Sequence, residues 1–138
     1  MAGLLIPEDF PLTKLEGQEV TQVCIGLNQV QLHFYRPVAS ASKPQWEPGA
    51  RIEIEAGFVL RQPNLEERCV YKNPIGKLCG QLTVLLGETV TSVSRLDRNE
   101  LLIQFSTKIE LQLLTDEQGF ESYHLHIEGN SVDVTKPW

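Results

Sequence analysis

The sequence lacks long hydrophobic runs, and this shortage argues against a membrane-spanning or exported protein. Its opening residues, MAGLLIPEDFPL, contain an apolar run of only three residues, with no basic segment before it and with prolines at Pro7 and Pro11. A membrane-spanning helix needs about 20 apolar residues, and a secretory signal needs a basic start followed by a longer apolar segment. We therefore expect neither a signal peptide nor a membrane span.

Cysteine and basic residues are also scarce. The three cysteines, Cys24, Cys69 and Cys79, form no Cys-x-x-Cys pair, and an odd number does not suit a disulfide framework. A reducing cytoplasm is the expected location. Lysine and arginine total 12 against 18 acidic residues, which gives a formal net charge of −6. Nucleic acid and anionic membranes attract positively charged surfaces, so neither is expected as a partner.

Catalytic sequence motifs are missing as well. The chain has no Gly-x-Ser-x-Gly elbow, and Gly76-Lys77 lacks the upstream glycine of a phosphate-binding loop. We expect no cofactor, and enzymatic activity is the less favoured hypothesis.

What the sequence does contain is a repeat. LEGQEVTQV at residues 15–23 recurs as LLGETVTSV at residues 85–93. Each phrase is followed by an alternating run that ends in phenylalanine, first VQLHF and then ELLIQF, and later by RIEI or KIEL. Apolar residues at every second position are typical of strands with one face on a core. Each copy therefore predicts a three-stranded antiparallel meander, with Gly17 and Gly87 at positive φ where the chain enters the first strand.

The segments outside the meanders predict three further elements. Between the copies, apolar residues recur with helical spacing and predict one short helix that ends at Gly87. After the second copy, FESYHLHIEG predicts an added strand, and the tail SVDVTKPW predicts either an edge strand or a segment that wraps back. The helical stripe comprises Ile75, Leu78, Cys79, Leu82, Leu85 and Leu86.

Together these patterns predict a single, mainly β (α+β) domain over residues 1–138. Two pseudo-repeated meanders, at residues 15–60 and 85–127, are joined by a linker and the short helix at residues 61–86. Antiparallel sheets of this kind would hold about six to eight strands. The sequence leaves open whether the repeats form one sheet or two facing sheets, and it leaves the oligomeric state open.

His124 and His126 form the nearest approach to a metal-binding pattern. At alternate strand positions both imidazoles lie on one face, a geometry that zinc and iron sites use. The third ligand would come from His33, Glu110 or Glu128. The alternative is that both histidines simply line the solvent face of a strand.

Glu121 shares the phase of the apolar residues of the same run, Tyr123, Leu125 and Ile127. If Glu121 is buried, it needs a partner and is a candidate acid–base group. We favour the alternative that it lies at the entrance of the strand and reaches water.

An insertion in the first copy, YRPVASASKPQWEPGA, predicts an exposed loop that displays Trp46 between Pro44 and Pro48. Tryptophan is common at interaction hot spots, so Trp46 either contacts a partner or folds back over the core. The candidate partner-binding residues are Trp46, Glu47, Glu53, Glu55 and Glu110.

Four stretches, LLGETVTSV, ELLIQF, KIELQL and FESYHLHI, resemble a family of small, largely uncharacterised bacterial domains. The family pattern is Leu-x-Gly-x-x-Val, a hydrophobic strand ending in Phe, a second strand, and an aromatic-Glu-Ser-aromatic run. The resemblance covers residues 85–127, with a weaker echo in residues 15–54. This chain has Tyr123 where tryptophan is usual and Lys108 where glycine is usual. The resemblance implies no enzymatic activity, and some members of the family look like immunity proteins that neutralise a toxin.

Two alternative functions follow. The first is a non-enzymatic, cytoplasmic protein-binding domain, such as an immunity protein whose acidic surface blocks a basic toxin domain. The second is a metal-binding or hydrolytic domain that uses His124 and His126, with Glu121 as an acid–base group.

Overall fold

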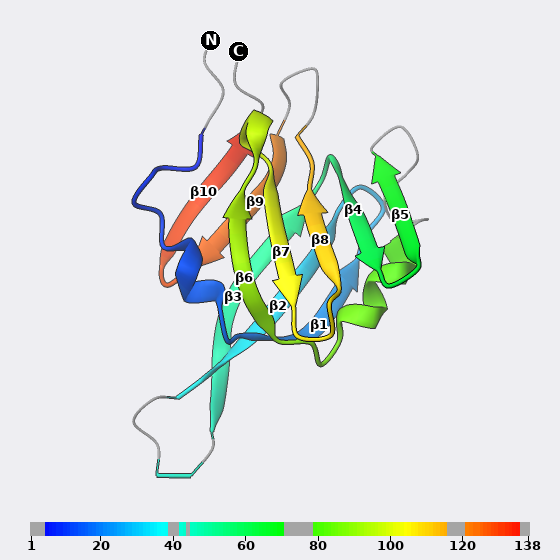
Figure 1. Ribbon diagram of the computed structural model, residues 1–138. Helices are drawn as coiled ribbons and strands as arrows, with labels where there is room; N and C mark the ends of the chain where they lie inside the picture. The colour runs from blue at the N-terminus through cyan, green and yellow to red at the C-terminus, as the bar shows by residue number, and fades with distance from the viewer. Residues whose placement is uncertain (1–4, 39–41, 44, 71–78, 116–120, 136–138) are drawn as a thin grey trace.

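Two five-stranded antiparallel sheets pack face to face in this protein (Figure 1). The structure is a computed structural model that describes residues 5–38, 42–43, 45–70, 79–115 and 121–135. In spatial order, sheet A contains β1 (Glu19–Ile25), β2 (Val30–Pro37), β3 (Trp46–Ile54), β9 (Glu121–Ile127) and β10 (Asn130–Thr135). Sheet B contains β5 (Leu65–Val70), β4 (Gly57–Gln62), β8 (Glu110–Leu113), β7 (Leu101–Phe105) and β6 (Val90–Arg95). The mainly β class is confirmed, although the described residues form ten strands rather than six to eight.

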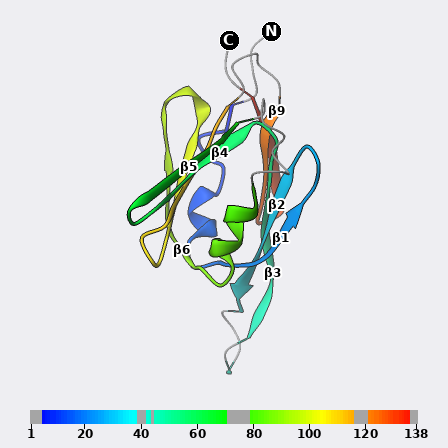
Figure 2. The ribbon, with the colours of Figure 1, turned by 90° about the vertical axis from the view of Figure 1, so that its right-hand side faces the viewer.

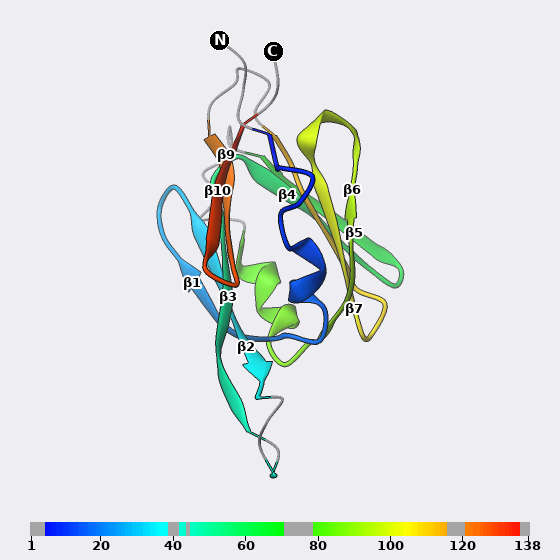
Figure 3. The same ribbon diagram turned by 90° about the vertical axis from the view of Figure 1, so that its left-hand side faces the viewer.

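The helical segments of the described residues are all of the 3-10 type. They are η1 (Leu12–Leu15), η2 (Cys79–Leu85) and η3 (Asp97–Asn99). Figures 2 and 3 show η1 and η2 between the two sheets, where Leu15, Leu82 and Leu85 are fully buried. The short helix expected before the second repeat is therefore η2, and it ends before Gly87 as predicted. Ile75 and Leu78 of the expected stripe lie outside the described residues.

Each sheet combines strands from both repeats. The meander β1–β2–β3 of the first repeat is extended by the hairpin β9–β10, which follows the meander of the second repeat in sequence. The meander β6–β7–β8 of the second repeat is extended by the hairpin β4–β5, which follows the meander of the first repeat. The structural repeat is thus five strands long, and the segment expected as a linker carries the end of β4 and all of β5. The C-terminal tail forms the edge strand β10, one of the two expected possibilities.

The chain changes sheets directly after β3. Apolar and polar residues alternate without interruption over residues 51–58, a pattern typical of one strand, but β3 ends at Ile54 in sheet A and β4 begins at Gly57 in sheet B. Ile54 and Phe58 are both fully buried, so they reach the same core from opposite sheets. Alternation identifies which residues face the core but not the sheet to which they belong.

The structural alignment of the two repeats also differs from the sequence alignment, which matched RIEI with KIEL. In sheet A, Leu32 pairs with Ile52, and in sheet B, Ile103 pairs with Leu111. Ile52 is therefore equivalent to Leu111, not to Ile109. A shift of two residues keeps every side chain on the same face, so the alternating pattern alone does not reveal it.

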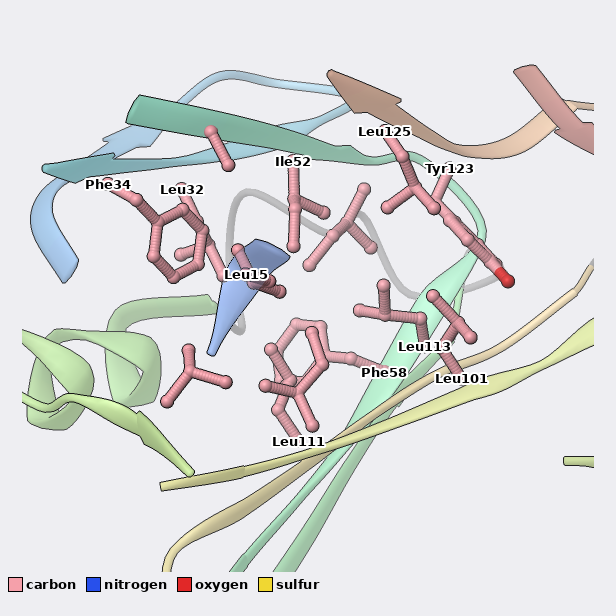
Figure 4. Packing of buried hydrophobic residues seen from close by; sticks show 14 of the residues in the cluster. Leu15, Leu32, Phe34, Ile52, Phe58, Leu101, Leu111, Leu113, Tyr123 and Leu125 are labelled. Carbon is pink, nitrogen blue, oxygen red and sulfur yellow. The ribbon is translucent and has the colours of Figure 1, made fainter. Parts of the chain in front are cut away.

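A continuous hydrophobic core fills the space between the sheets (Figure 4). From sheet A, Leu32, Phe34 and Ile52 point inward, and Phe58 and Leu111 point toward them from sheet B. Each of these side chains is essentially inaccessible to solvent. Burial of one such side chain contributes about 1.5–3 kcal/mol, so this layer holds both sheets in place and fixes the outer faces that carry the polar residues.

Candidate functional site

The outer face of sheet A carries all three histidines of the sequence. His33 lies on β2, and His124 and His126 lie on β9. The strand register places His33 beside Arg51 and Arg51 beside His126. In the adjacent row, Glu53 pairs with His124, which pairs with Asp133. Residues directly opposite one another on neighbouring strands share a face, so these side chains form one polar surface.

His124 is the most enclosed histidine and contacts carboxylates on both of its ring nitrogens. Only 9% of the residue is exposed. Its Nδ1 lies 2.6 Å from Oδ1 of Asp133, and its Nε2 lies 2.7 Å from Oε2 of Glu55. Oε2 of Glu121 lies 3.7 Å from the same Nε2. Three carboxylates from three strand segments therefore converge on one imidazole.

An irregularity in the pairing of β3 with β9 brings the two glutamates to His124. Regular pairing ends at Ile54 opposite Tyr123, and the amides of Glu55 and Ala56 then both donate to the carbonyl of Ser122 at 2.9 Å. Two residues of one strand facing one residue of its neighbour form a bulge, which turns side chains away from strict alternation. Glu121 is exposed, as expected of a residue at the entrance of the strand.

The two histidines of β9 have different electrostatic surroundings. Burial lowers the pKa of His124, but the hydrogen bonds to Asp133 and Glu55 outweigh burial and raise this pKa above the ordinary 6.5. Burial and the neighbouring Arg51 guanidinium lower the pKa of His126. The surroundings of His124 thus favour its protonated form, whereas those of His126 favour the neutral form.

The structure does not bring His124 and His126 together as a pair of metal ligands. Nδ1 of His126 lies 2.9 Å from Oγ of Ser131, and its Nε2 lies 4.0 Å from Oε1 of Glu53. Within the described part of the chain, the ligand atoms that do lie together, all within 4.8 Å of one another, belong to Glu55, Glu121 and His124. Glu55 was expected only as a partner-binding residue.

The expected third ligands lie elsewhere. His33 contacts Oε1 of Gln31 through Nε2 at 3.1 Å. Glu110 lies on sheet B, where it accepts a hydrogen bond from Gln104. Glu128 follows β9 and pairs with Arg36.

The candidate partner-binding residues do not form one surface. Trp46 and Glu47 begin β3, Glu53 and Glu55 lie further along on the outer face of sheet A, and Glu110 lies on sheet B. Glu53 and Glu55 already contact groups of this chain, Arg51 at 3.2 Å and His124 at 2.7 Å.

Trp46 belongs to a second candidate site at the end of the β2–β3 hairpin. Both strands extend beyond the neighbouring strands of sheet A, as Figures 1 and 3 show. Residues 35–38 and 45–48 of this hairpin are here called the hairpin arm. Within it Tyr35 pairs with Pro48 and Pro37 with Trp46, so these four side chains share one face. All four are exposed, Tyr35 by 39% and Trp46 by 46%.

The opposite face of the hairpin arm carries ion pairs. Nε of Arg36 lies 2.8 Å from Oε1 of Glu47, and a terminal guanidinium nitrogen of Arg36 lies 2.5 Å from Oε1 of Glu128. The second contact joins the arm to the turn between β9 and β10. The arm therefore has one aromatic and proline-rich face and one charged, anchored face. Trp46 is exposed and does not fold back over the core, and its contact with a partner stays a prediction.

Among the described residues, no helix is long and apolar enough to cross a membrane. Comparisons with protein-family models, with curated proteins and with solved structures find no match to this chain.

Proposed function

We propose that this protein is a non-enzymatic binding domain that recognises a protein partner through its hairpin arm. The observation that carries the proposal is the exposure of Trp46 and Tyr35 on one face of a projecting hairpin. Exposed tryptophan and tyrosine side chains are the residues that most often dominate interface energetics, because each buries a large area at a small entropic cost.

Two further features support this role. Pro37 and Pro48 flank the aromatic residues and restrict the backbone of the arm. The ion pairs of Arg36 with Glu47 and Glu128 hold the arm against the sandwich. A binding element that is already ordered loses less conformational entropy when it binds.

The net charge of −6 favours a basic partner. Opposite charge accelerates encounter and makes association sensitive to salt. A basic toxin domain, with this chain as the immunity protein that blocks it, is the specific form of the proposal that the family resemblance implies.

The test is capture of partners from a lysate of the source organism on the tagged chain, with Trp46→Ala and Leu27→Ala variants in parallel. Leu27 is 70% exposed and lies in the turn at the opposite end of β2, so it is a matched apolar control. We expect one basic protein in stoichiometric amount on the wild-type chain and on Leu27→Ala, and a loss of about tenfold or more on Trp46→Ala.

The captured protein is then expressed alone and together with the chain. If the captured protein is toxic alone and co-expression of this chain suppresses the toxicity, the chain is an immunity protein. If the captured protein is harmless, the binding function stands but the toxin-blocking function is contradicted. The absence of a stoichiometric partner, or equal capture by all three chains, contradicts recognition through the hairpin arm.

A further inference from the structure

We propose that Glu55, Glu121 and His124 form a binding site for a divalent transition-metal ion, in which Asp133 orients the imidazole ligand. This site lies on the outer face of sheet A, is separate from the hairpin arm, and does not depend on partner binding.

The distances among the three side chains suit a common ion. Nε2 of His124 lies 2.7 Å from Glu55 and 3.7 Å from Glu121, and all three ligand atoms lie within 4.8 Å of one another. In a tetrahedral site with metal–ligand bonds of about 2.0–2.2 Å, neighbouring ligand atoms are about 3.4 Å apart. Small rotations of the two glutamate side chains are enough to reach that geometry, and both side chains are open to solvent, at 35% and 57% exposure.

Asp133 gives His124 the orientation of a metal ligand. It contacts Nδ1 at 2.6 Å and so directs Nε2 toward the two glutamates. A carboxylate on the far nitrogen is the usual partner of a metal-bound histidine, since it fixes the tautomer and increases the basicity of the ligand nitrogen.

The cluster also carries an excess of negative charge. Three carboxylates face one imidazole, which supplies at most one positive charge. A single N–H on Nε2 donates to Glu55, and the Glu121 oxygen at 3.7 Å is beyond hydrogen-bonding distance of that nitrogen. A divalent cation interacts with both glutamates at once. It balances the negative charge that remains when only one proton, on Nε2 of His124, lies between them.

The equivalent position in the other repeat carries an apolar side chain in place of His124. In sheet A, Tyr123 pairs with Ile54, and the next residue, His124, pairs with Glu53. In sheet B, Phe58 pairs with Leu113, and the next residue, Val59, pairs with Gln112. Val59 therefore occupies the position equivalent to His124. Since a fully buried valine serves the structural role in one repeat, the polar cluster in the other repeat indicates a separate purpose.

The donor set indicates the class of ion. One imidazole nitrogen and two carboxylate oxygens suit zinc and related transition-metal ions, whereas calcium and magnesium prefer oxygen ligands alone. Three protein ligands leave at least one coordination position for water or for a ligand of another molecule.

The test is calorimetric titration of Zn²⁺ into chelator-treated, full-length protein, with the variants Glu121→Gln, His124→Gln and His126→Gln. Glu121 is exposed, so its variant keeps the test valid if His124→Gln fails to fold. His126 lies on the same strand and face but outside the cluster, which makes its variant the matched control. Co²⁺ spectra of the wild-type protein distinguish this site from cysteine thiolates, which give an intense charge-transfer band.

We expect one Zn²⁺ per chain, at least about tenfold weaker binding by Glu121→Gln and His124→Gln, and unchanged binding by His126→Gln. We also expect Ca²⁺ and Mg²⁺ to bind much more weakly and the Co²⁺ spectrum to lack a thiolate band. The proposal is overturned by the absence of stoichiometric binding, by a thiolate spectrum, by unchanged binding in Glu121→Gln, or by an equal loss in His126→Gln.

Discussion

Gly17 and Gly87 occupy equivalent places in the two repeats, and each donates a hydrogen bond to the other repeat. The amide of Gly17 donates to the carbonyl of Val90 at 2.8 Å, and the amide of Gly87 donates to the carbonyl of Val20 at 2.8 Å. The repeated phrases of the sequence are therefore bonded to one another. This reciprocal contact gives a structural reason why the same phrase occurs twice.

Replacement of either glycine by alanine should destabilise the protein. The φ angles of Gly17 and Gly87 are +85° and +84°, in the left-handed region that costs other residues about 1–2 kcal/mol. An added methyl group meets no crowding, because the nearest atom belongs to Glu19 at 4.0 Å from the position at Gly87. We expect Gly17→Ala and Gly87→Ala each to lower the free energy of unfolding in urea by about 1–2 kcal/mol.

Gly80→Ala is the matched control for this prediction. Gly80 lies in η2, has open space around it and does not have a left-handed φ, so alanine there should be neutral or slightly stabilising. Equal effects of all three substitutions would mean that positive φ is not what selects glycine at the first two positions.

Gln18 is a position at which the two repeats differ in their chemistry, unlike the two glycines. It is only 2% exposed. Its Oε1 accepts a hydrogen bond from the amide of Ala50 at 2.8 Å, and its Nε2 donates to the carbonyl of Lys14 at 2.8 Å. Gln18→Ala leaves both backbone groups without these partners. We expect it to lower the free energy of unfolding by about 1–3 kcal/mol.

Glu88 occupies the equivalent place in the second repeat and serves as the control for Gln18. Its carboxylate accepts a hydrogen bond from the hydroxyl of Thr107 at the surface. Glu88→Ala should therefore change the free energy of unfolding by only about 0.5 kcal/mol. A loss in Gln18→Ala no larger than this would show that the buried amide contributes little.

The sequence was sufficient to predict the strands of the two meanders and β9, because a period of two residues follows directly from strand geometry. It did not predict β5, which lies in the segment expected as a linker. It did not predict that each repeat extends the sheet of the other. The run at residues 51–58 alternates through the point where the chain changes sheets, since inward-facing residues of both sheets contact the same core. A run with an apolar residue at every second position therefore carries no information about which sheet each part of it joins.

The candidate metal site was predictable in part. Alternation placed His124 and His126 on one face of a strand, and the structure confirms that arrangement. The contribution of Glu55 depends on the bulge opposite Ser122 and on strand pairing between distant segments, since Glu55 and His124 are 69 residues apart in the sequence. Neither feature has a local signal in the sequence, so the ligand group centred on His124 became visible only in the folded chain.

The buried hydroxyl of Tyr123 should make stability depend on alkaline pH. This hydroxyl donates to the carbonyl of Asn99 at 2.6 Å, and burial raises the pKa of Tyr123 far above its ordinary value of 10. A folded-state pKa above the unfolded value contributes stability that is complete below pH 10 and declines as the pH rises beyond it. We expect Tyr123→Phe to lose about 1 kcal/mol at pH 8, and the difference from wild type to shrink above pH 10.

Urea unfolding of both proteins between pH 8 and pH 11 measures this difference directly, because all other titrating groups are common to the two chains. Tyr35→Phe is the control, since Tyr35 is 39% exposed. A pH-independent difference between wild type and Tyr123→Phe would be incompatible with a phenol that ionises only on unfolding.

Arg36 should determine how firmly the hairpin arm is held. Its guanidinium contacts Glu47 within the arm and Glu128 at the turn after β9. Further along the arm, the amide of Val38 donates to the carbonyl of Gln45 at 2.8 Å. Arg36→Met keeps the aliphatic part of the side chain but removes both ion pairs, so the arm should open more often. Because these groups are at the surface, global stability should not change measurably.

Hydrogen exchange resolved at the amide of Val38 tests this expectation, since exchange there reports local opening. We expect exchange in Arg36→Met to be roughly three to ten times faster than in wild type. Arg61→Met is the control, because Arg61 pairs with Glu66 on the β4–β5 hairpin of sheet B and should leave Val38 unaffected. If the arm binds the partner in its ordered form, Arg36→Met also weakens capture while Trp46 remains in place. Unchanged exchange at Val38 would show that the ion pairs do not keep the arm ordered. Its proline residues would then be the source of its rigidity.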